Sequence, residues 1–221
     1  MKHDLKIVDL GRMAYEQALE LQEKIVGEVK DGKSPDALFL VEHDHVYTLG
    51  RNAKEGNILL PEKRLKEMGV SIFRIGRGGD VTYHGPGQLV VYPIIKIPGG
   101  PRKVVEYVSN LERVILGVLD ELGVKATTDR ANRGVWAGND KVAAIGVRVT
   151  RGVTMHGFAI NVAPDLKYFG GIIPCGIKGK GVTSLDRLVK GLTMERVKGL
   201  TVENFKKVFG YEEFAKRIGN C

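Results

Sequence analysis

The sequence is poor in cysteine: among its 221 residues only Cys175 and Cys221 carry a thiol. Two cysteines cannot build the framework of a disulfide-rich secreted domain. No run of about 18 apolar residues occurs, which excludes an ordinary membrane-spanning helix. The first eight residues hold no long apolar segment of the kind that a secretory signal needs. From these absences we expect an intracellular protein that works in the cytoplasm and not in a membrane.

Several common catalytic motifs are also missing. The sequence has no GxxxxGK[ST] phosphate loop, and no GxGxxG opens a predicted helix. It lacks the Gly-x-Ser-x-Gly turn that presents the nucleophile of many serine hydrolases. These absences leave cysteine as the candidate nucleophile.

Acidic residues are fewer than basic ones, 26 against 34, and the net charge is +8. A basic protein favours an acidic partner, which includes nucleic acid. A nucleic-acid-binding module is therefore an alternative, and it would bind with a strong salt dependence. However, the basic residues are scattered among Asp and Glu and form no long basic run, which is typical of solvated helix faces.

Glycine, by contrast, is concentrated in one stretch, Arg77-Gly-Gly-Asp-Val-Thr-Tyr-His-Gly-Pro-Gly-Gln88. It lies between two strand-like runs, and its glycines would let the backbone approach a ligand closely. The polar side chains within it would then converge on that ligand. An ordinary hairpin loop accounts for the same composition equally well.

The length suits one domain over residues 1–221, or less readily two small ones, and a short helical tail is expected from about residue 186. Apolar residues at helical spacing predict helices, and short apolar or alternating runs predict strands. The helices are expected at 12–30, 61–68 and 103–122. The strands are expected at 37–41, 46–51, 70–74, 89–97 and 152–162, with a hairpin over 134–149.

His43 and His45 invite a metal-site interpretation. A strand would point both imidazoles to one side, but no third histidine or cysteine lies at a ligand spacing nearby. We therefore expect no metal.

Cys175 lies in a predicted loop between a proline and a glycine, where the backbone could present its thiol to a cleft. A buried small hydrophobe is the alternative interpretation, and Cys221 is expected to have no role. A thiol needs a base or a cation to become a thiolate, because its free pKa is about 8.5. Lys141, His84 and His156 are candidates, and spacing alone does not choose among them.

Four motifs together resemble the lipoyl(octanoyl) transferase family. They are the glycine-rich stretch, Lys141-Val-Ala-Ala-Ile-Gly146, His156-Gly-Phe-Ala-Ile-Asn161 and Pro174-Cys-Gly-Ile177 followed by Val182-Thr-Ser-Leu185. The resemblance runs from about Leu38 to Leu185 in the family's order, and Tyr47-Thr-Leu-Gly-Arg51 also fits it. Asp44-His45 departs from the family, which commonly has prolines there.

The resemblance implies a mixed sheet flanked by helices, an α/β (α+β) fold similar to the catalytic domain of biotin and lipoate protein ligases. It implies transfer of an octanoyl group from octanoyl-acyl carrier protein to a lysine of a lipoyl domain. The acceptors would be 2-oxoacid dehydrogenase E2 subunits and the glycine cleavage H protein. No cofactor, nucleic acid or membrane is expected to take part.

The resemblance also implies roles for single residues. Cys175 would carry the acyl thioester, and Lys141 would act as its base. The nearest rival is a lipoate–protein ligase, which activates a free acid with ATP; Cys175 and the lack of an added C-terminal domain argue against it. The residues implied to line the acyl site are Arg77, Gly78, Gly79, Asp80, Val81, Thr82, Tyr83, His84, Ala144, Ile145, Gly146, Gly157, Phe158 and Ala159.

Overall fold

The computed structural model describes residues 4–97, 101–129, 131–173 and 180–211. Its helices are α1 (Tyr15–Lys30), α2 (Glu62–Glu67), α3 (Pro101–Glu121) and α4 (Met194–Phe209), with short 3-10 turns at Glu55–Asn57, Leu166–Gly171 and Leu185–Arg187. Its strands are β1 (Leu5–Arg12), β2 (Asp36–Glu42), β3 (Val46–Leu49), β4 (Ser71–Arg74), β5 (Val81–His84), β6 (Gln88–Ile94), β7 (Thr127–Thr128), β8 (Val135–Ala137), β9 (Asp140–Thr150), β10 (Val153–Asn161) and β11 (Gly181–Val182).

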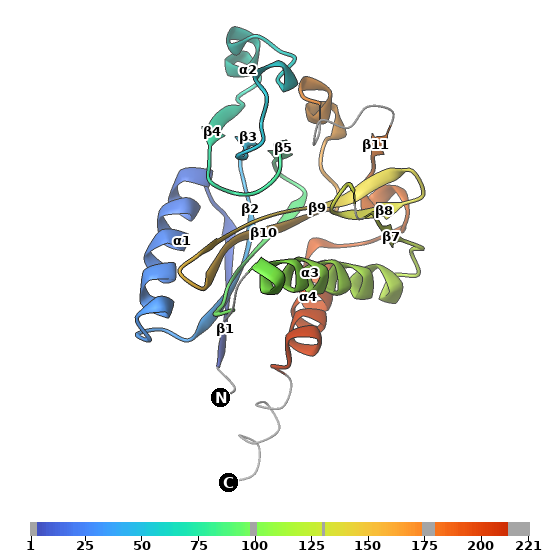
Figure 1. Cartoon of the computed structure of the whole chain (residues 1–221). Coiled ribbons are helices and arrows are strands. Elements are labelled where there is room, and N and C mark those ends of the chain that lie inside the picture. Colours follow the sequence, from blue (N-terminus) through green and yellow to red (C-terminus); the bar gives the residue numbers. More distant parts are fainter. Residues whose placement is uncertain (1–3, 98–100, 130, 174–179, 212–221) are drawn as a thin grey trace.

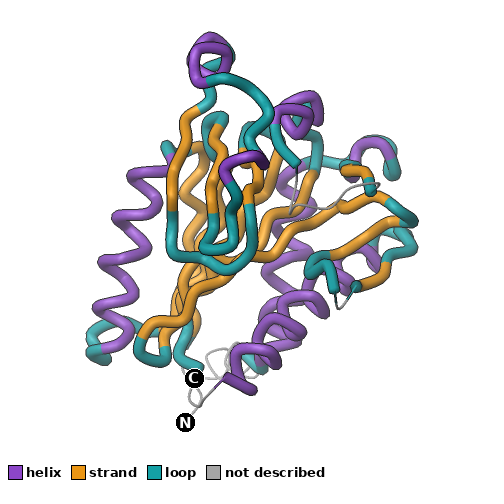
Figure 2. Tube along the Cα trace, turned by 45° about the horizontal axis from the view of Figure 1, so that its top comes forward, coloured by secondary structure: helices purple, strands orange, loops and turns teal. Residues whose placement is uncertain are grey.

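The strands form two sheets. The larger has the order β1-β2-β6-β10-β9-β8-β7, and β11 pairs with β9 beside this path. Most neighbours are antiparallel, whereas β1 with β2 and β11 with β9 are parallel. The smaller sheet has the order β4-β3-β5, and in the tilted view of Figure 2 its loops lie in front of the larger sheet. The predicted mixed sheet is confirmed.

Helices cover both faces of the larger sheet, with α1 on one side and α3 and α4 on the other (Figure 1). Strand periodicity explains this, because alternate side chains point to opposite faces. On β2, Leu38 and Leu40 pack toward α3 and α4, whereas Phe39 and Val41 pack toward α1. A third apolar cluster joins the smaller sheet to α2 and is centred on Tyr47, Tyr83 and Leu65.

Four strands, β1, β5, β7 and β11, were not expected from the sequence. The first helix begins at Tyr15 and not at residue 12, because residues 5–12 form β1 on the edge of the larger sheet. Inside the glycine-rich stretch, Val81–His84 form β5, which pairs antiparallel with β3. The four-residue strand carries buried side chains on both faces, so it has none of the alternation that identifies a strand in sequence.

The C-terminal residues also differ from a row of short helices. One 16-residue helix, α4, begins at the capping side chain of Thr193 and ends at Gly210 in the left-handed conformation. Its Val197 and Phe205 are buried in the main core. A Cβ at Gly117 of α3 would collide with Asn204 of α4, so the glycine allows the two helices to approach closely.

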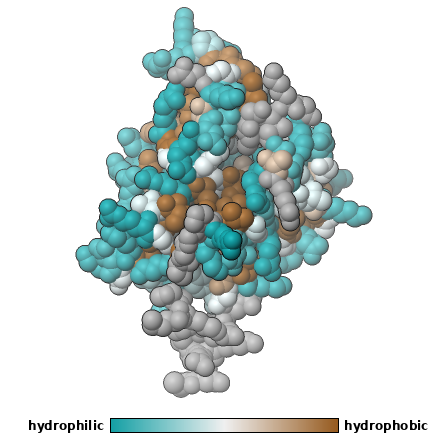
Figure 3. Space-filling model, viewed as in Figure 1, coloured by the Kyte–Doolittle hydropathy of each residue, from teal (hydrophilic) through white to brown (hydrophobic). Residues whose placement is uncertain are grey.

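Among the described residues, no helix is long and apolar enough to cross a membrane. The space-filling view shows a mixed surface, in which apolar residues are visible in the middle of one face between hydrophilic ones (Figure 3).

Candidate active site

The glycine-rich loop places the guanidinium of Arg77 inside the protein, with 6% of the residue exposed. Its nitrogens donate to the carbonyl (2.6 Å) and the hydroxyl (2.9 Å) of Thr48 on β3, and to the carbonyl of Gly78 (2.9 Å). Gly146 on β9 faces the same side chain, since a Cβ there would lie 2.9 Å from Cδ of Arg77. The loop and β9 therefore meet across a buried cation.

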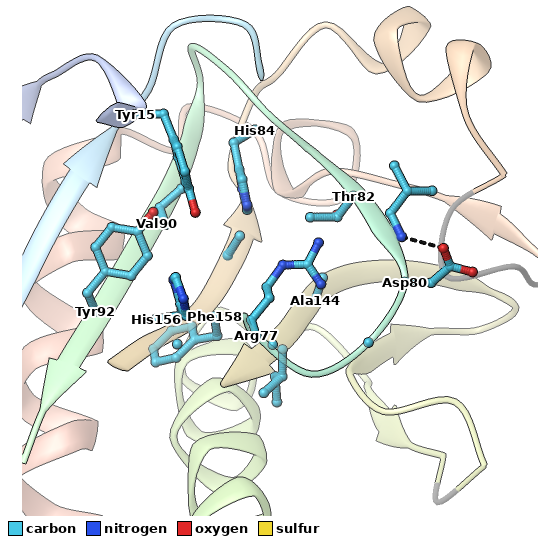
Figure 4. A pocket seen from close by; sticks show the side chains of 16 residues that line it. Tyr15, Arg77, Asp80, Thr82, His84, Val90, Tyr92, Ala144, His156 and Phe158 are labelled. Atoms are coloured by element: carbon cyan, nitrogen blue, oxygen red, sulfur yellow. Dashed lines mark hydrogen bonds between the residues drawn. The ribbon is translucent and has the colours of Figure 1, made fainter. Parts of the chain in front are cut away.

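A deep pocket opens around this arginine, between the glycine-rich loop, β9 and β10 (Figure 4). Ala144 on β9 and Phe158 on β10 form apolar parts of its wall, whereas His84 and Thr82 come from β5. All residues predicted to line an acyl site are brought together here, except Gly78 and Tyr83. The lining residues are Tyr15, Arg77, Gly79, Asp80, Val81, Thr82, His84, Val90, Tyr92, Ala144, Ile145, Gly146, His156, Gly157, Phe158 and Ala159.

The two exceptions lie nearby. Tyr83 points away from the pocket: its ring stacks on Tyr168 at 5.3 Å, and its hydroxyl bonds to Nδ1 of His45 at 2.8 Å. Gly78 lies in the next cavity, where its backbone N–H donates to the carbonyl of Val147 (2.8 Å).

That next cavity is an outer cleft of about 440 Å³ that contains Lys141. Gly79, Asp80, Ile145 and Gly146 line both the outer cleft and the deep pocket. The outer cleft and the deep pocket therefore adjoin at these four residues.

Lys141 stands at the start of β9, directly after the tight turn in which Gly138 takes a φ of +62°. The hairpin was predicted, and it fixes the direction of the lysine. Only 6% of the residue is exposed. Its Nζ donates to the carbonyl of Arg133 (3.0 Å) and lies 4.7 Å from the centre of the Trp136 ring. The fold thus buries an amine at the outer cleft.

Cys175 lies outside the described residues, as does Cys221; the described chain ends at Ile173 before Cys175 and resumes at Lys180 after it. Ile173 donates its backbone N–H to the carbonyl of Asn57 (2.9 Å). Val182 of β11 pairs with Lys141. β11 therefore runs beside the buried lysine.

Asp80 fixes the first of these flanks. Its Oδ1 accepts from the N–H of Val81 (2.7 Å), and its Oδ2 accepts from the side chain of Asn57. Asn57 in turn holds Ile173. Asp80 thereby connects the glycine-rich loop to the segment that precedes Cys175.

A second chain of hydrogen bonds fixes the other flank. His84 Nδ1 bonds to Gln88 Oε1 (2.6 Å), Gln88 Nε2 donates to Asn161 Oδ1 (2.9 Å), and Asn161 Nδ2 donates to the carbonyl of Thr183 (2.9 Å). Thr183 N–H donates to the carbonyl of Lys141 (3.0 Å). The wall of the deep pocket is thus tied to the residues around β11.

The two histidines that were alternative candidates for the base lie in a different cavity from Lys141. His84 and His156 line the deep pocket and not the outer cleft. Burial lowers the pKa of each to about 3, with the neighbouring His43 contributing at His84 and Arg77 at His156. Both imidazoles are therefore neutral at physiological pH, whereas Lys141 lines the outer cleft and pairs with β11.

Sequence reasoning missed Tyr15, Val90 and Tyr92 as pocket residues. Tyr15 begins α1 and Tyr92 lies within a buried strand, and neither position carries a local signal of a site. Only the packing of α1 against β6 and β10 brings them to the glycine-rich loop.

The histidine pair that suggested a metal has other partners. His43 Nδ1 bonds to the carbonyl of Met13 (2.8 Å) and Nε2 to the hydroxyl of Tyr92 (2.7 Å). His45 bonds to Tyr83. Within the described part of the chain, no group of three or more His, Cys, Asp or Glu side chains is placed to hold a metal ion.

Comparison with known proteins places these features in one family. The model of the lipoyl protein ligase A/B catalytic domain matches residues 14–206. An octanoyltransferase from Alkaliphilus metalliredigens is 47% identical over 186 residues, covering 84% of this chain and 85% of the relative. An octanoyltransferase from Caldicellulosiruptor bescii is 45% identical over 209 residues, which cover 93% of this chain and 92% of the relative.

Solved structures of low sequence identity share the fold. A lipoate-protein ligase A bound with ATP has a TM-score of 0.79 at 16% identity, covering 95% of this chain and 86% of its own. A bi-partite lipoate protein ligase from Thermoplasma acidophilum, studied with its E2 lipoyl domain, has a TM-score of 0.74 at 14% identity. The match covers 95% of this chain and 84% of the ligase. A biotin protein ligase from Aquifex aeolicus has a TM-score of 0.52 at 12% identity, and the match covers 96% of this chain and 71% of that ligase. The fold predicted from the motifs is confirmed.

Proposed function

The chain belongs to the lipoyl protein ligase A/B catalytic-domain family and groups with its octanoyltransferases, so its activity is octanoyl transfer, and we propose that the transfer runs through a thioester on Cys175 with Lys141 as the base. The observation that carries this proposal is the buried amine of Lys141 at the outer cleft beside the deep pocket; its strand pairs with β11, which follows Cys175 in the chain.

In the first step, the amine of Lys141 takes the proton of the Cys175 thiol. The thiolate attacks the carbonyl carbon of octanoyl-acyl carrier protein, the bond from that carbon to the carrier sulfur breaks, and the carrier leaves as a thiol once it is protonated. One thioester replaces another, so the step is close to thermoneutral and needs no ATP. The covalent intermediate divides one difficult transfer into two easier ones.

In the second step, the ε-amine of the target lysine attacks the Cys175 thioester. Lys141 can accept the proton that this amine loses. An amide forms, the carbon–sulfur bond breaks, and the Cys175 thiol is restored. Conversion of a thioester into an amide is downhill and completes the cycle.

The alkyl chain would lie along the path from the outer cleft to the deep pocket. Ala144 and Ile145 supply apolar surface there, and Gly79 and Gly146 let the Arg77 side chain pack closely against the backbone. Burial of each methylene contributes about 0.8 kcal/mol to binding, which favours an acyl chain over a short acid. The fourteen implied acyl-site residues remain predictions as ligand contacts.

The proposed donor is octanoyl-acyl carrier protein, and the proposed acceptors are the lipoyl domains of 2-oxoacid dehydrogenase E2 subunits and the glycine cleavage H protein. We place the reaction in the cytoplasm, because a free catalytic thiol needs a reducing compartment. Residues 1–221 would act as a single catalytic domain.

Substitution of Lys141 tests the base. Lys141→Ala should slow acylation at pH 7 by about 10²–10⁴-fold, the usual contribution of a positioned base, and should recover partly near pH 8.5, where a free thiol ionises unaided. Lys141→Arg should not restore the rate, because arginine stays protonated and cannot accept the proton. The measurement is the rate of transfer from octanoyl-carrier protein to a lipoyl domain without ATP.

Lys180 offers a matched control, because its Nζ lies 4.3 Å from the centre of the same Trp136 ring and pairs with Asp129 at 2.8 Å. Lys180→Arg preserves that charge and should retain the rate. A wild-type rate in Lys141→Arg would mean that the lysine acts only through its charge. Transfer that required free octanoate and ATP would identify the ligase reaction instead.

A further inference from the structure

The far end of the deep pocket is polar, although the proposed substrate ends in a methyl group. Tyr15, His84, Tyr92 and His156 lie there, and each is at most 9% exposed. Figure 4 shows their hydroxyl and imidazole groups turned toward one another, on the side of Arg77 away from Asp80. We call these four side chains the polar floor.

The hydrogen bonds of the polar floor leave several polar atoms facing the pocket. His84 donates from Nδ1 to Gln88 Oε1, since the Gln88 amide nitrogen already donates elsewhere, and Nε2 of His84 keeps its lone pair. His43 donates from Nδ1 to a carbonyl, so the Tyr92 hydroxyl donates to His43 Nε2 and keeps its oxygen lone pairs. The Tyr15 hydroxyl and the His156 imidazole make no hydrogen bond to another residue of the described chain.

His156 reaches the floor through an unusual backbone. Its φ is +59°, in the left-handed region that residues other than glycine rarely adopt. The side-chain oxygen of Gln22 on α1 accepts its backbone N–H at 2.9 Å and holds this conformation. Such conformations cluster at active sites and ligand clamps, and the His156 side chain lines the pocket.

The deep pocket has a cavity volume of about 50 Å³, which exceeds the roughly 10–15 Å³ that one water needs. A buried water also needs two to four polar partners, and the polar floor supplies them. Burial holds the pKa of His84 and of His156 at about 3. The floor is therefore a set of neutral hydrogen-bonding groups suited to a small polar molecule such as water.

We propose that the polar floor of Tyr15, His84, Tyr92 and His156 sets the acyl chain length, by keeping a hydrogen-bonded water at the end of the pocket that a longer chain would have to displace. The inference rests on the proposed acyl transfer. An acyl chain that ends before the water leaves the hydrogen bonds of the polar floor intact. A longer chain gains apolar burial but leaves buried donors and acceptors without partners, and that loss outweighs the gain of a methylene.

Tyr15→Phe tests the floor with little change in volume, since it removes only a hydroxyl. The measurement is the transfer rate of hexanoyl, octanoyl, decanoyl and dodecanoyl groups from carrier protein to a lipoyl domain. We expect the ratio of the decanoyl to the octanoyl rate to rise about tenfold, the size expected when one buried polar group no longer needs a partner. His156→Gly, which suits the left-handed backbone, should raise the same ratio.

Tyr107→Phe is the matched control, because Tyr107 is a buried tyrosine on α3 that does not line the pocket; its profile should match the wild type. An unchanged ratio in both Tyr15→Phe and His156→Gly, with octanoyl transfer intact in the wild type, would overturn the polar floor alone. A wild-type protein that transfers none of the four chains would overturn the proposed function itself. A profile that shifts in Tyr107→Phe as much as in Tyr15→Phe would also overturn the floor.

Discussion

At the scale of single residues, three buried histidines connect this site to the stability of the protein. His43, His84 and His156 each have a lowered pKa, about 4, 3 and 3, with burial as the largest cause. In the unfolded chain an imidazole titrates near 6.5. Below that pH the unfolded state therefore binds protons that the folded state does not.

This difference predicts loss of stability in mild acid. Stability rises with pH wherever the unfolded state binds more protons, so the contribution of these groups is complete above about pH 6.5 and is lost as the pH falls toward their folded values. Urea unfolding between pH 7.5 and 5 should show the free energy of unfolding falling as the pH is lowered, at up to about 1.4 kcal/mol per pH unit for each histidine. His84→Gln should reduce this slope, and a flat profile over that range would contradict the lowered pKa values.

The sequence predicted a site residue only where that residue belongs to a recognisable motif. Arg77, Lys141 and Ala144 stand in recognisable motifs, and the structure places them around two adjoining cavities. Tyr15 had no such signal, because its place in the pocket depends on how α1 packs against the sheet. Lys141 remains the proposed base, and the structure adds that His84 and His156 line the other cavity.

At the scale of elements, the close approach of the glycine-rich loop to β9 depends on Gly146. A Cβ there would lie 2.9 Å from Cδ of Arg77 and 3.3 Å from the carbonyl of Gly78. Gly146→Ala should displace the arginine into the acyl path and lower octanoyl transfer at least tenfold. Because Arg77 is buried and the Gly78 carbonyl belongs to the backbone, the loop must shift, and a thermal melt of the variant separates a loss of stability from a loss of transfer.

Gly27→Ala is the control for this prediction. Gly27 lies in α1 with no atom near its added Cβ, so the substitution should stabilise the helix by about 0.5–1 kcal/mol and leave transfer unchanged. Thermal melts and transfer rates of both variants make the comparison. Normal transfer in Gly146→Ala would place the acyl chain elsewhere.

The sequence predicted elements that carry a clear apolar pattern and missed elements that lack one. α1 and α3 have many apolar residues at helical spacing, and the β8–β9 hairpin is marked by Gly138 at its turn. β5 was hidden, because four residues with both faces buried between glycines carry no period. The packing of α4 depends on contact with α3, which is distant in the sequence, so the local spacing of apolar residues does not predict it.

At the scale of the whole molecule, the net charge of +8 suits an acidic carrier. Arg51 and Lys54 are exposed on either side of Asn52, which lines the outer cleft. Arg51→Glu should raise the KM for the carrier substrate and weaken its salt dependence, since exposed charges are screened beyond about 8 Å at physiological salt. Lys24→Glu on α1 makes the same change of charge away from the cleft and should alter neither.

To compare the Arg51→Glu and Lys24→Glu variants with the wild type, KM for the carrier substrate is measured at salt concentrations from about 20 mM to about 500 mM. Acylation rates that do not change with ionic strength, or equal effects of the two substitutions, would show that charge beside the cleft does not guide the carrier.

The covalent intermediate on Cys175 is the central claim, and intact mass spectrometry tests it most directly. The protein would be mixed with octanoyl-carrier protein, without ATP and without a lipoyl domain. The account predicts one added octanoyl group, retained in Cys221→Ser, absent in Cys175→Ser, and discharged when a lipoyl domain is added. An unmodified protein that still transfers octanoyl groups, or an adduct that survives in Cys175→Ser, would contradict it.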